Sequence, residues 1–188
     1  AEMEKERGVV QEELSMTNDY PSYRVDLLTD EMLWPGHPMG RDVGGTRESV
    51  DGVTHPMLVD WFQKHYVASN MVVSVAGNIS HGEVVESVAG LLQGLPEGAI
   101  PTCRPAAHGD GSYPRVRLEA RKTEQAHLSL CLPGLPTRHP DRYALDMMNG
   151  VLGDGMSSRL FVEVREKRGL AYEVHSSVTH FGDTGCIV

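Results

Sequence analysis

Basic side chains are scarce in this sequence, and so are aromatic ones. Among 188 residues there are 17 Lys and Arg against 26 Asp and Glu, a formal net charge of −9 at pH 7, and only 6% of residues are aromatic. This balance argues against the broad basic surface that binds nucleic acid. Residues 1–100 hold six basic and sixteen acidic side chains (net −10), and residues 101–188 hold eleven and ten (net +1). Such asymmetry is typical of two distinct modules.

Long hydrophobic runs and paired cysteines are also missing. No stretch approaches the roughly 18 apolar residues of a membrane-spanning helix, so no span is expected. Cys103, Cys131 and Cys186 are odd in number and far apart, which excludes a Cys-x-x-Cys zinc ribbon and a disulfide framework. We expect reduced, partly buried thiols. The compartment is not identified, although a soluble cytoplasmic protein is favoured over a secreted one.

Apolar periodicity and breaker residues predict helices in the first half of the chain. The last predicted helix there starts at Ser80, where Ser80 and Glu83 fit a capping box. A continuous apolar run before it, residues 71–76, predicts a buried strand. The predicted helices cover residues 3–16, 22–33, 54–66 and 80–94.

The second half reads as a separate mixed unit. Strict alternation predicts strands at 115–121 and 126–132, a helix follows Pro140, another spans about 157–167, and 170–181 alternates again before a partner strand. We therefore predict an α+β fold of antiparallel-rich sheets covered by helices. The predicted domains are 1–94, a proline-rich linker 95–114, and 115–188. Because the chain opens in a predicted helix and closes in a predicted strand, both ends are expected to be cut.

Two glutamates of the first predicted helix share one face. Glu6 and Glu13 are seven residues apart, which is two helical turns with about 20° of drift, so both carboxylates project from the same side. Spacing alone favours a solvated acidic helix, because carboxylates are mostly exposed. The pair gains meaning only from its sequence context.

That context resembles a known family. The stretch Glu6-Arg7-Gly8-Val9-Val10-Gln11-Glu12-Glu13-Leu14 looks like the second metal-binding helix of the pitrilysin or insulinase family, the inverzincin zinc metallopeptidases that include mitochondrial processing peptidases. Residues 36–41, 70–78 and above all 152–172 resemble that family in order and separation. The resemblance covers practically the whole chain and implies a processing-peptidase-like metallohydrolase fold, with parts of two similar domains.

The resemblance implies a catalytic zinc in the intact protein. Glu13 would be its third protein ligand beside two histidines, leaving a position open to water, and Glu6 would orient a ligand or that water from the second shell. The two histidines belong to a His-x-x-Glu-His helix whose Glu is the general base. That motif does not occur in these 188 residues. We therefore expect the chain alone to be inactive.

Arg165 and Tyr172, also seven residues apart, are the other implied site residues. In the family, such an Arg and Tyr reach from the second domain toward the bound peptide near the zinc. A guanidinium offers fork-like hydrogen bonds to a carbonyl or terminal carboxylate, and a phenol stabilises an oxyanion. Spacing alone would instead favour an exposed Arg and a strand-packing Tyr.

Three functions remain open at this point, and one of them, a generic α/β binding module, predicts that Glu13 and Arg165 lie far from any shared cleft. The other two concern the family. The first is a fragment of a zinc endopeptidase whose peptide substrate is enclosed between two domains and whose site is completed by the missing N- and C-terminal parts. The second is a family member without catalysis that acts as a structural or substrate-presenting subunit. The joint presence of Glu6, Glu13, Arg165 and Tyr172 favours the enzyme. Whether the intact protein is one chain or a homo- or heterodimer is not decided.

Overall fold

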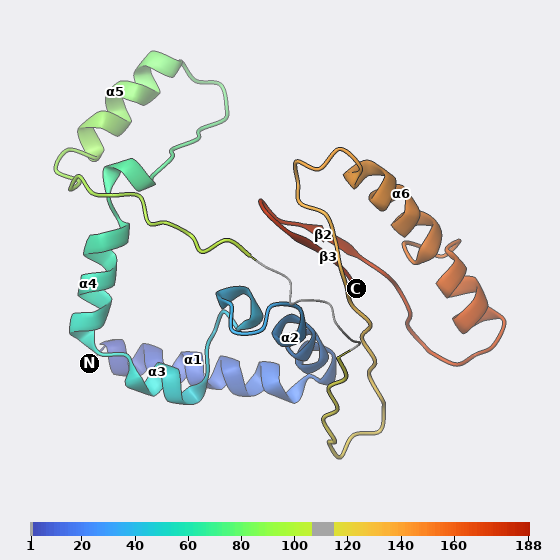
Figure 1. The fold of residues 1–188 in the computed structure, drawn as a ribbon. Coiled ribbons are helices and arrows are strands. Elements are labelled where there is room, and N and C mark those ends of the chain that lie inside the picture. The colour runs from blue at the N-terminus through green and yellow to red at the C-terminus, as the bar shows by residue number, and fades with distance from the viewer. Residues whose placement is uncertain (1, 107–114) are drawn as a thin grey trace. The chain divides into compact units, whose positions relative to one another are not determined.

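The computed structural model describes residues 2–106 and 115–188 (Figure 1). Contacts between backbone segments divide the chain into two compact units. Unit 1 comprises the residues up to Arg7 together with Arg47–Arg104, and unit 2 comprises Gly8–Thr46 and the described residues from Pro105 to Val188. The elements are α1 (Glu2–Asp19), α2 (Pro21–Leu33), η1 (Pro38–Gly40), α3 (Arg47–Gly52), α4 (His55–His65), η2 (Ala68–Asn70), α5 (His81–Leu91), β1 (Leu132–Pro133), α6 (Arg142–Leu152), η3 (Phe161–Glu166), β2 (Val178–His180) and β3 (Gly185–Ile187).

Unit 1 is mostly helical and its interior is small. Val67 is its buried apolar residue, at 2% exposure, and the neighbouring Ala68 N–H donates to the carbonyl of Pro96. Pro56 lies in the first turn of α4, where its missing N–H costs nothing. Aromatic side chains stack at the end of α4: the ring of Phe62 lies 4.3 Å from that of Tyr66, the residue after the helix. These rings remain largely exposed, so local stacking replaces a core there.

Unit 2 contains a hydrophobic core where α2 meets a small sheet. Leu33, Trp34 and Cys186 form the buried cluster, and Phe181 meets the Trp34 ring edge-on at 5.7 Å. The sheet is antiparallel with the order β1, β3, β2, and Cys186 pairs with Thr179 on one side and Pro133 on the other. Burial raises the pKa of the Cys131 and Cys186 thiols, whereas Cys103 in unit 1 is exposed. The partly buried thiols expected from the sequence thus occur in unit 2 alone.

The helix-rich chain with a small antiparallel sheet confirms the α+β prediction. The helices predicted at 3–16, 22–33, 54–66 and 80–94 all form with shifted ends. Ser80 precedes α5, but its side chain makes no capping hydrogen bond, so the predicted capping box is wrong. Helix α3 was not predicted from the sequence, because six residues leave too short a stretch for periodicity.

The predicted strands fare worse than the helices. Residues 71–76 and 115–121 take part in no sheet within the described chain, and of 126–132 only Leu132 pairs. Their alternating apolar side chains are exposed, at 89% for Leu118 and 94% for Leu128. A strand exists only through hydrogen bonds to a neighbour, so pattern alone does not make one. The domain boundaries predicted from sequence stay a prediction, and residues 107–114 of the predicted linker lie outside the described residues.

Candidate functional site

Helix α1 positions the two glutamates. It runs without interruption from Glu2 to Asp19, so Glu6 and Glu13 are about 10 Å apart along the axis at 1.5 Å per residue. Leu14 is buried in unit 2 at 8% exposure and fixes which side of the helix faces inward. Glu6 and Glu13 lie off that buried line, and both are exposed.

Both carboxylates are available to a ligand. Within residues 2–106 and 115–188, neither Glu6 nor Glu13 forms an ion pair or a side-chain hydrogen bond. Arg7, one of the two cations that flank Glu6 in the sequence, is engaged elsewhere: its Nε lies 3.1 Å from a Glu4 carboxylate oxygen, and its guanidinium donates to the carbonyls of Val50 and Val53. Arg7 lowers the pKa of Glu4 by this contact and makes no ion pair with Glu6.

Glu13 has the donor chemistry of a metal ligand, but the described residues do not form a complete metal site. Among the described residues, no three His, Cys, Asp or Glu side chains converge on a common point where an ion would fit. An exposed carboxylate without a partner has the donor chemistry of a zinc ligand, and a tetrahedral site needs two further protein ligands. The described residues therefore fit a contribution to a metal centre and do not form one by themselves.

The structure brings Arg165 and Tyr172 together. The guanidinium carbon of Arg165 lies over the Tyr172 ring, 5.3 Å from its centroid, within the range of a cation–π contact. It also lies over the ring of Phe161 at 4.8 Å. Tyr172 is 85% exposed, so its hydroxyl is open to solvent. The Tyr is thus a surface residue and not the strand-packing one that spacing alone favours.

Glycine at position 169 makes this meeting possible. Gly169 has φ +60°, in the left-handed region that an L side chain rarely adopts, and the chain reverses there. Its N–H donates to the carbonyl of Arg165, and the Leu170 N–H donates to that of Val164. These bonds close the end of η3 and direct the chain so that Tyr172 returns beside Arg165.

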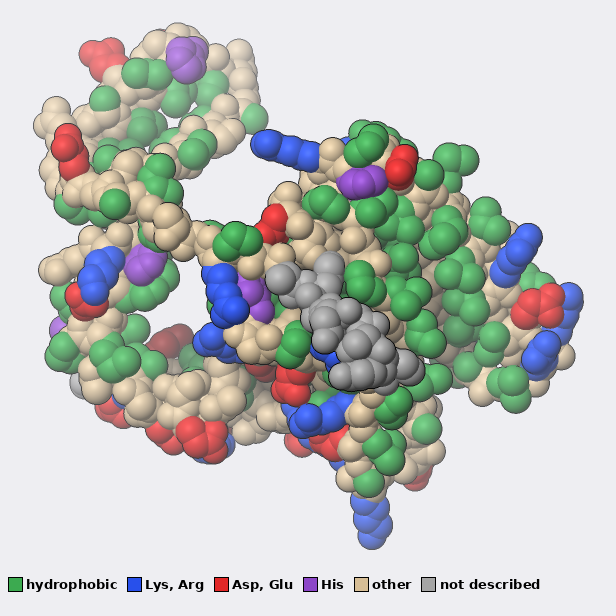
Figure 2. Space-filling view, viewed as in Figure 1, with side chains coloured by type: hydrophobic (Ala, Val, Ile, Leu, Met, Phe, Trp, Pro, Cys, Tyr) green, Lys and Arg blue, Asp and Glu red, His purple; other side chains and the backbone are tan. Residues whose placement is uncertain are grey.

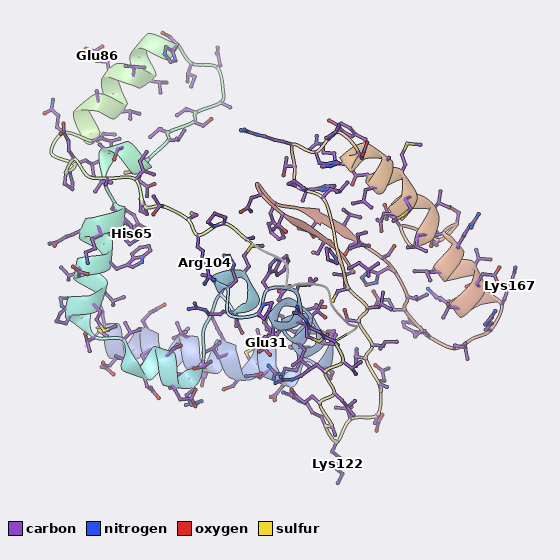
Figure 3. All side chains as sticks on the ribbon, viewed as in Figure 1. Glu31, His65, Glu86, Arg104, Lys122 and Lys167 are labelled. Carbon is purple, nitrogen blue, oxygen red and sulfur yellow. The ribbon has the colours of Figure 1, made fainter. Side chains whose placement is uncertain are left out.

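The helix that holds Arg165 is of an uncommon type. The sequence predicts an α-helix over about 157–167, but Phe161–Glu166 forms a π-helix, with the Lys167 N–H donating to the carbonyl of Val162 five residues back. Lys167, labelled in Figure 3, directly follows η3 and its Nζ lies 2.6 Å from Glu163. Single π turns often occur at functional sites. Sequence periodicity does not distinguish a π turn from an α turn over so few residues.

Buried polar contacts hold the segment that precedes η3. Ser176 donates its hydroxyl hydrogen to Asn149 Oδ1 at 2.7 Å, and its N–H donates to the carbonyl of Gly153. Ser158 is 1% exposed, and its hydroxyl accepts the N–H of Phe161 at 3.4 Å. The glycine-rich stretch before η3 is therefore packed as structure. Sequence reasoning missed Phe161, although an aromatic residue four positions before an Arg on a helix is a recognisable pairing.

A histidine and an aspartate join α6 to the sheet in the same unit. His180 Nε2 lies 3.0 Å from Asp146 Oδ1, and its Nδ1 lies 2.5 Å from the carbonyl oxygen of Leu135. Both ring nitrogens face acceptors, a pairing that only the doubly protonated imidazole satisfies. The bond to the Leu135 carbonyl, and then that to Asp146, raise the pKa of His180.

Several known proteins resemble this chain in sequence or in structure. Residues 52–188 match the Peptidase M16 inactive domain. An uncharacterized zinc protease of Streptomyces coelicolor is 40% identical over 98% of the chain and 41% of its own length. A Helicobacter pylori protease is similar in structure, with a TM-score of 0.83, 25% identity, and 99% and 46% of the two chains covered.

The same fold occurs outside proteins that are named proteases. A chain of Complex III2 from Candida albicans aligns with a TM-score of 0.77 and 19% identity, over 97% of this chain and 45% of that one. In all three cases the present chain spans less than half the length of its relative.

No helix in the described residues combines the length and the apolar character needed to cross a bilayer. The match to the family model over residues 52–188 shows that this chain belongs to the M16 peptidase family.

Proposed function

We propose that this chain is part of a zinc-dependent endopeptidase that hydrolyses peptides enclosed between two domains, and that the chain alone is inactive. The observation that supports this best is the contact between Arg165 and Tyr172, at 5.3 Å, in a chain 40% identical to a relative named a zinc protease. Spacing alone did not require these two side chains to meet. Their meeting supplies a cation and a phenol to one exposed surface.

Each glutamate of α1 has a distinct role in this proposal. Glu13 would donate one oxygen ligand to the zinc, and Glu6, seven residues earlier on the same helix, would orient another ligand or the water. When bound, zinc supplies Lewis-acid catalysis and makes water a nucleophile near neutral pH. Both carboxylates are exposed and make no ion pair among the described residues, so neither must break a contact to take up its role.

Arg165 and Tyr172 act on the peptide. The guanidinium donates paired hydrogen bonds to a backbone carbonyl or a terminal carboxylate, which fixes the substrate in register. The Tyr172 hydroxyl donates a hydrogen bond to the oxygen that gains charge during attack. The cation–π contact holds the Arg beside the Tyr, so both donors face the same substrate.

The rest of the intact protein completes this site and covers the apolar surface that the chain exposes. In this proposal, residues 1–94 are the rear half of the metal-binding domain, 95–114 a linker, and 115–188 the front half of the substrate-contacting domain. Exposed large apolar side chains support it, because soluble proteins rarely expose wide apolar patches. Figure 2 shows hydrophobic side chains over the part of unit 2 that contains α6, where Met147 is 75% exposed. The unpaired cysteines suit a cytoplasmic protein.

Neutralising Glu13 in the full-length protein tests the proposal directly. We expect Glu13→Gln to lower hydrolysis of an internally quenched peptide by at least about 100-fold and to reduce bound zinc, since second-shell changes alone cost about 10- to 100-fold. Glu12→Gln is the matched control, because it removes the neighbouring exposed carboxylate from the same helix. A Glu13→Gln protein with normal zinc content and activity would overturn the assignment.

A non-catalytic role is the second candidate, favoured by the description of the matched family as an inactive domain. In that case the intact protein lacks the His-x-x-Glu-His helix and binds no stoichiometric zinc. Metal analysis of the full-length protein separates the two candidates. The isolated 188-residue chain should cleave no peptide in either case, and zinc-dependent cleavage by it would contradict both.

A further inference from the structure

The Arg165 guanidinium contacts a second ring that the proposed chemistry does not use. Its carbon lies 4.8 Å from the Phe161 centroid, closer than the 5.3 Å to Tyr172. Both distances fall within the roughly 6 Å at which an aromatic face attracts a cation. Phe161 and Arg165 both belong to η3, four residues apart, so the Phe161 contact is intrinsic to the helix.

The backbone holds the two residues in fixed relative positions. The Phe161 N–H donates to Ser158, whose side chain is almost fully buried, and the carbonyl of Arg165 accepts the N–H of Gly169. One end of η3 is thus tied to a buried hydroxyl and the other to a left-handed glycine. Phe161 is itself half-buried, so its ring has less freedom than the exposed Tyr172 ring.

Nearby acids leave the Arg165 hydrogen-bond donors unoccupied. Glu163 is engaged by Lys167 at 2.6 Å, and this pair lowers the pKa of Glu163. Glu166 approaches the Arg165 Nε only to 3.9 Å, too far for a hydrogen bond. Among the described residues no hydrogen bond to the guanidinium is present. Ring faces hold the cation, and its N–H edge stays available.

We infer that Phe161 is a positioning residue: its ring face holds the Arg165 guanidinium so that the N–H edge is directed at the peptide substrate. This inference rests on the proposed function, because it takes Arg165 as a substrate contact. Phe161 itself donates nothing to the peptide. Its contribution is to restrict the rotamers of a long side chain before substrate arrives, which lowers the ordering cost of binding.

Graded fluorination of the Phe161 ring in the full-length protein tests this. Each added fluorine weakens the negative face of the ring while nearly preserving its shape, so a cation–π role predicts a stepwise fall in kcat/KM for peptide hydrolysis. Phe161→Leu should lower kcat/KM by about 3- to 30-fold, the effect of losing one such contact. Phe161→Tyr and Phe161→Trp should retain most of the activity. Phe62→Leu, which removes an exposed ring stacked on Tyr66, is the matched control.

A second readout does not depend on catalysis. The Arg165 Nε–H resonance should be shifted upfield by the rings and should move toward an ordinary arginine position in Phe161→Leu. Upfield shift together with absence of peptidase activity would overturn the proposed function while leaving the stacking intact. A kcat/KM that does not change across the fluorinated series would overturn the inference. So would a double variant, Arg165→Ala with Phe161→Leu, whose loss of kcat/KM equals the product of the losses in the two single variants, because Phe161 would then act independently of Arg165.

Discussion

The two compact units differ in how they use their aromatic side chains. In unit 2, Trp34 is 2% exposed and packs with Leu33 and Cys186 in a closed cluster. In unit 1, Trp61 and Phe62 are 54% and 55% exposed, and their rings stack on His65 and Tyr66 at the end of α4. Both regions show apolar periodicity in the sequence. The pattern therefore identifies a face to be buried, and the partner that buries it need not be in the same stretch of chain.

The largest effect should come from emptying the unit 2 core. We expect Trp34→Ala to lower the free energy of unfolding of the 188-residue chain by about 3–5 kcal/mol, as for a fully buried Trp. Trp61→Ala, the same change at an exposed position, should cost about 1 kcal/mol or less. Denaturant unfolding measures both. Equal losses would mean that the two units do not differ as their exposed fractions indicate.

A smaller effect should follow from filling a tight backbone contact before η3. A Cβ at Gly153 would overlap the backbone nitrogen of Ser176, so Gly153→Ala must displace backbone and should cost about 1–3 kcal/mol. At Gly150, inside α6, a Cβ meets nothing within 4 Å. Gly150→Ala should therefore be neutral or stabilising by up to about 1 kcal/mol. Thermal unfolding of the two variants, with opposite signs expected, tests whether this connection is rigidly packed.

Charge pairing gives a third contrast between the units. The Lys64–Asp60 pair of unit 1 is an exposed pair within one helix, whereas Glu119 of unit 2 accepts from both Arg24 at 2.8 Å and Arg121 at 2.6 Å. The bond from Arg24 and then that from Arg121 lower the pKa of Glu119 from 4.5 to about 2. A lowered carboxyl pKa adds stability above pH 4.5 that disappears as the pH falls toward 2.

Removing that carboxylate should therefore have a pH-dependent cost. We expect Glu119→Gln to destabilise the chain by about 1 kcal/mol at pH 7, since the pair is partly exposed, and the cost should shrink as the pH falls from 4.5 toward 2. Glu124→Gln, at an exposed position in the same segment, is the control. A cost of Glu119→Gln that is constant down to pH 2 would show that charge is not its origin.

The smallest effect should come from His180. Its pKa is raised by the Leu135 carbonyl and by Asp146, so the folded chain binds the proton more tightly than the unfolded one. The stabilisation is complete below the ordinary value of 6.5 and is lost as the pH rises through the higher folded value. We expect Asp146→Asn to cost less than about 1 kcal/mol at pH 6 and almost nothing at pH 9, measured by thermal unfolding. His175→Gln, which replaces an exposed histidine of the same unit, is the control variant.

The helices could be predicted from the sequence because their determinants are local. Three such determinants act within a few residues: the spacing of apolar side chains, Pro56 in a first turn, and Gly169 two positions after Lys167. Strand formation by the segments 71–76 and 115–121 depends instead on a neighbouring strand, which the sequence of each segment does not identify. Helix α6 shows the same limit, because its apolar residues recur at helical spacing and Tyr143 is nevertheless 63% exposed.

The candidate site divides in the same way. Glu6 and Glu13 follow from helical spacing plus the family resemblance, and the meeting of Arg165 with Tyr172 depends on Gly169 reversing the chain. Phe161 could not be identified from the sequence because helical spacing indicates which apolar residues share a face and does not indicate which of them contacts a cation. The π turn positions Phe161 through hydrogen bonds that span five residues, whereas those of an α-helix span four. The spacing of apolar residues does not reveal this difference.

Unequal shielding of the three thiols makes the chain suitable for site-selective chemistry. Cys103 is exposed in unit 1, while burial keeps Cys131 and Cys186 of unit 2 protonated and shielded. A maleimide dye or nitroxide should therefore react with Cys103 first, without any cysteine being removed by mutation. A probe attached there would report distances from unit 1 to a second marker elsewhere in the protein.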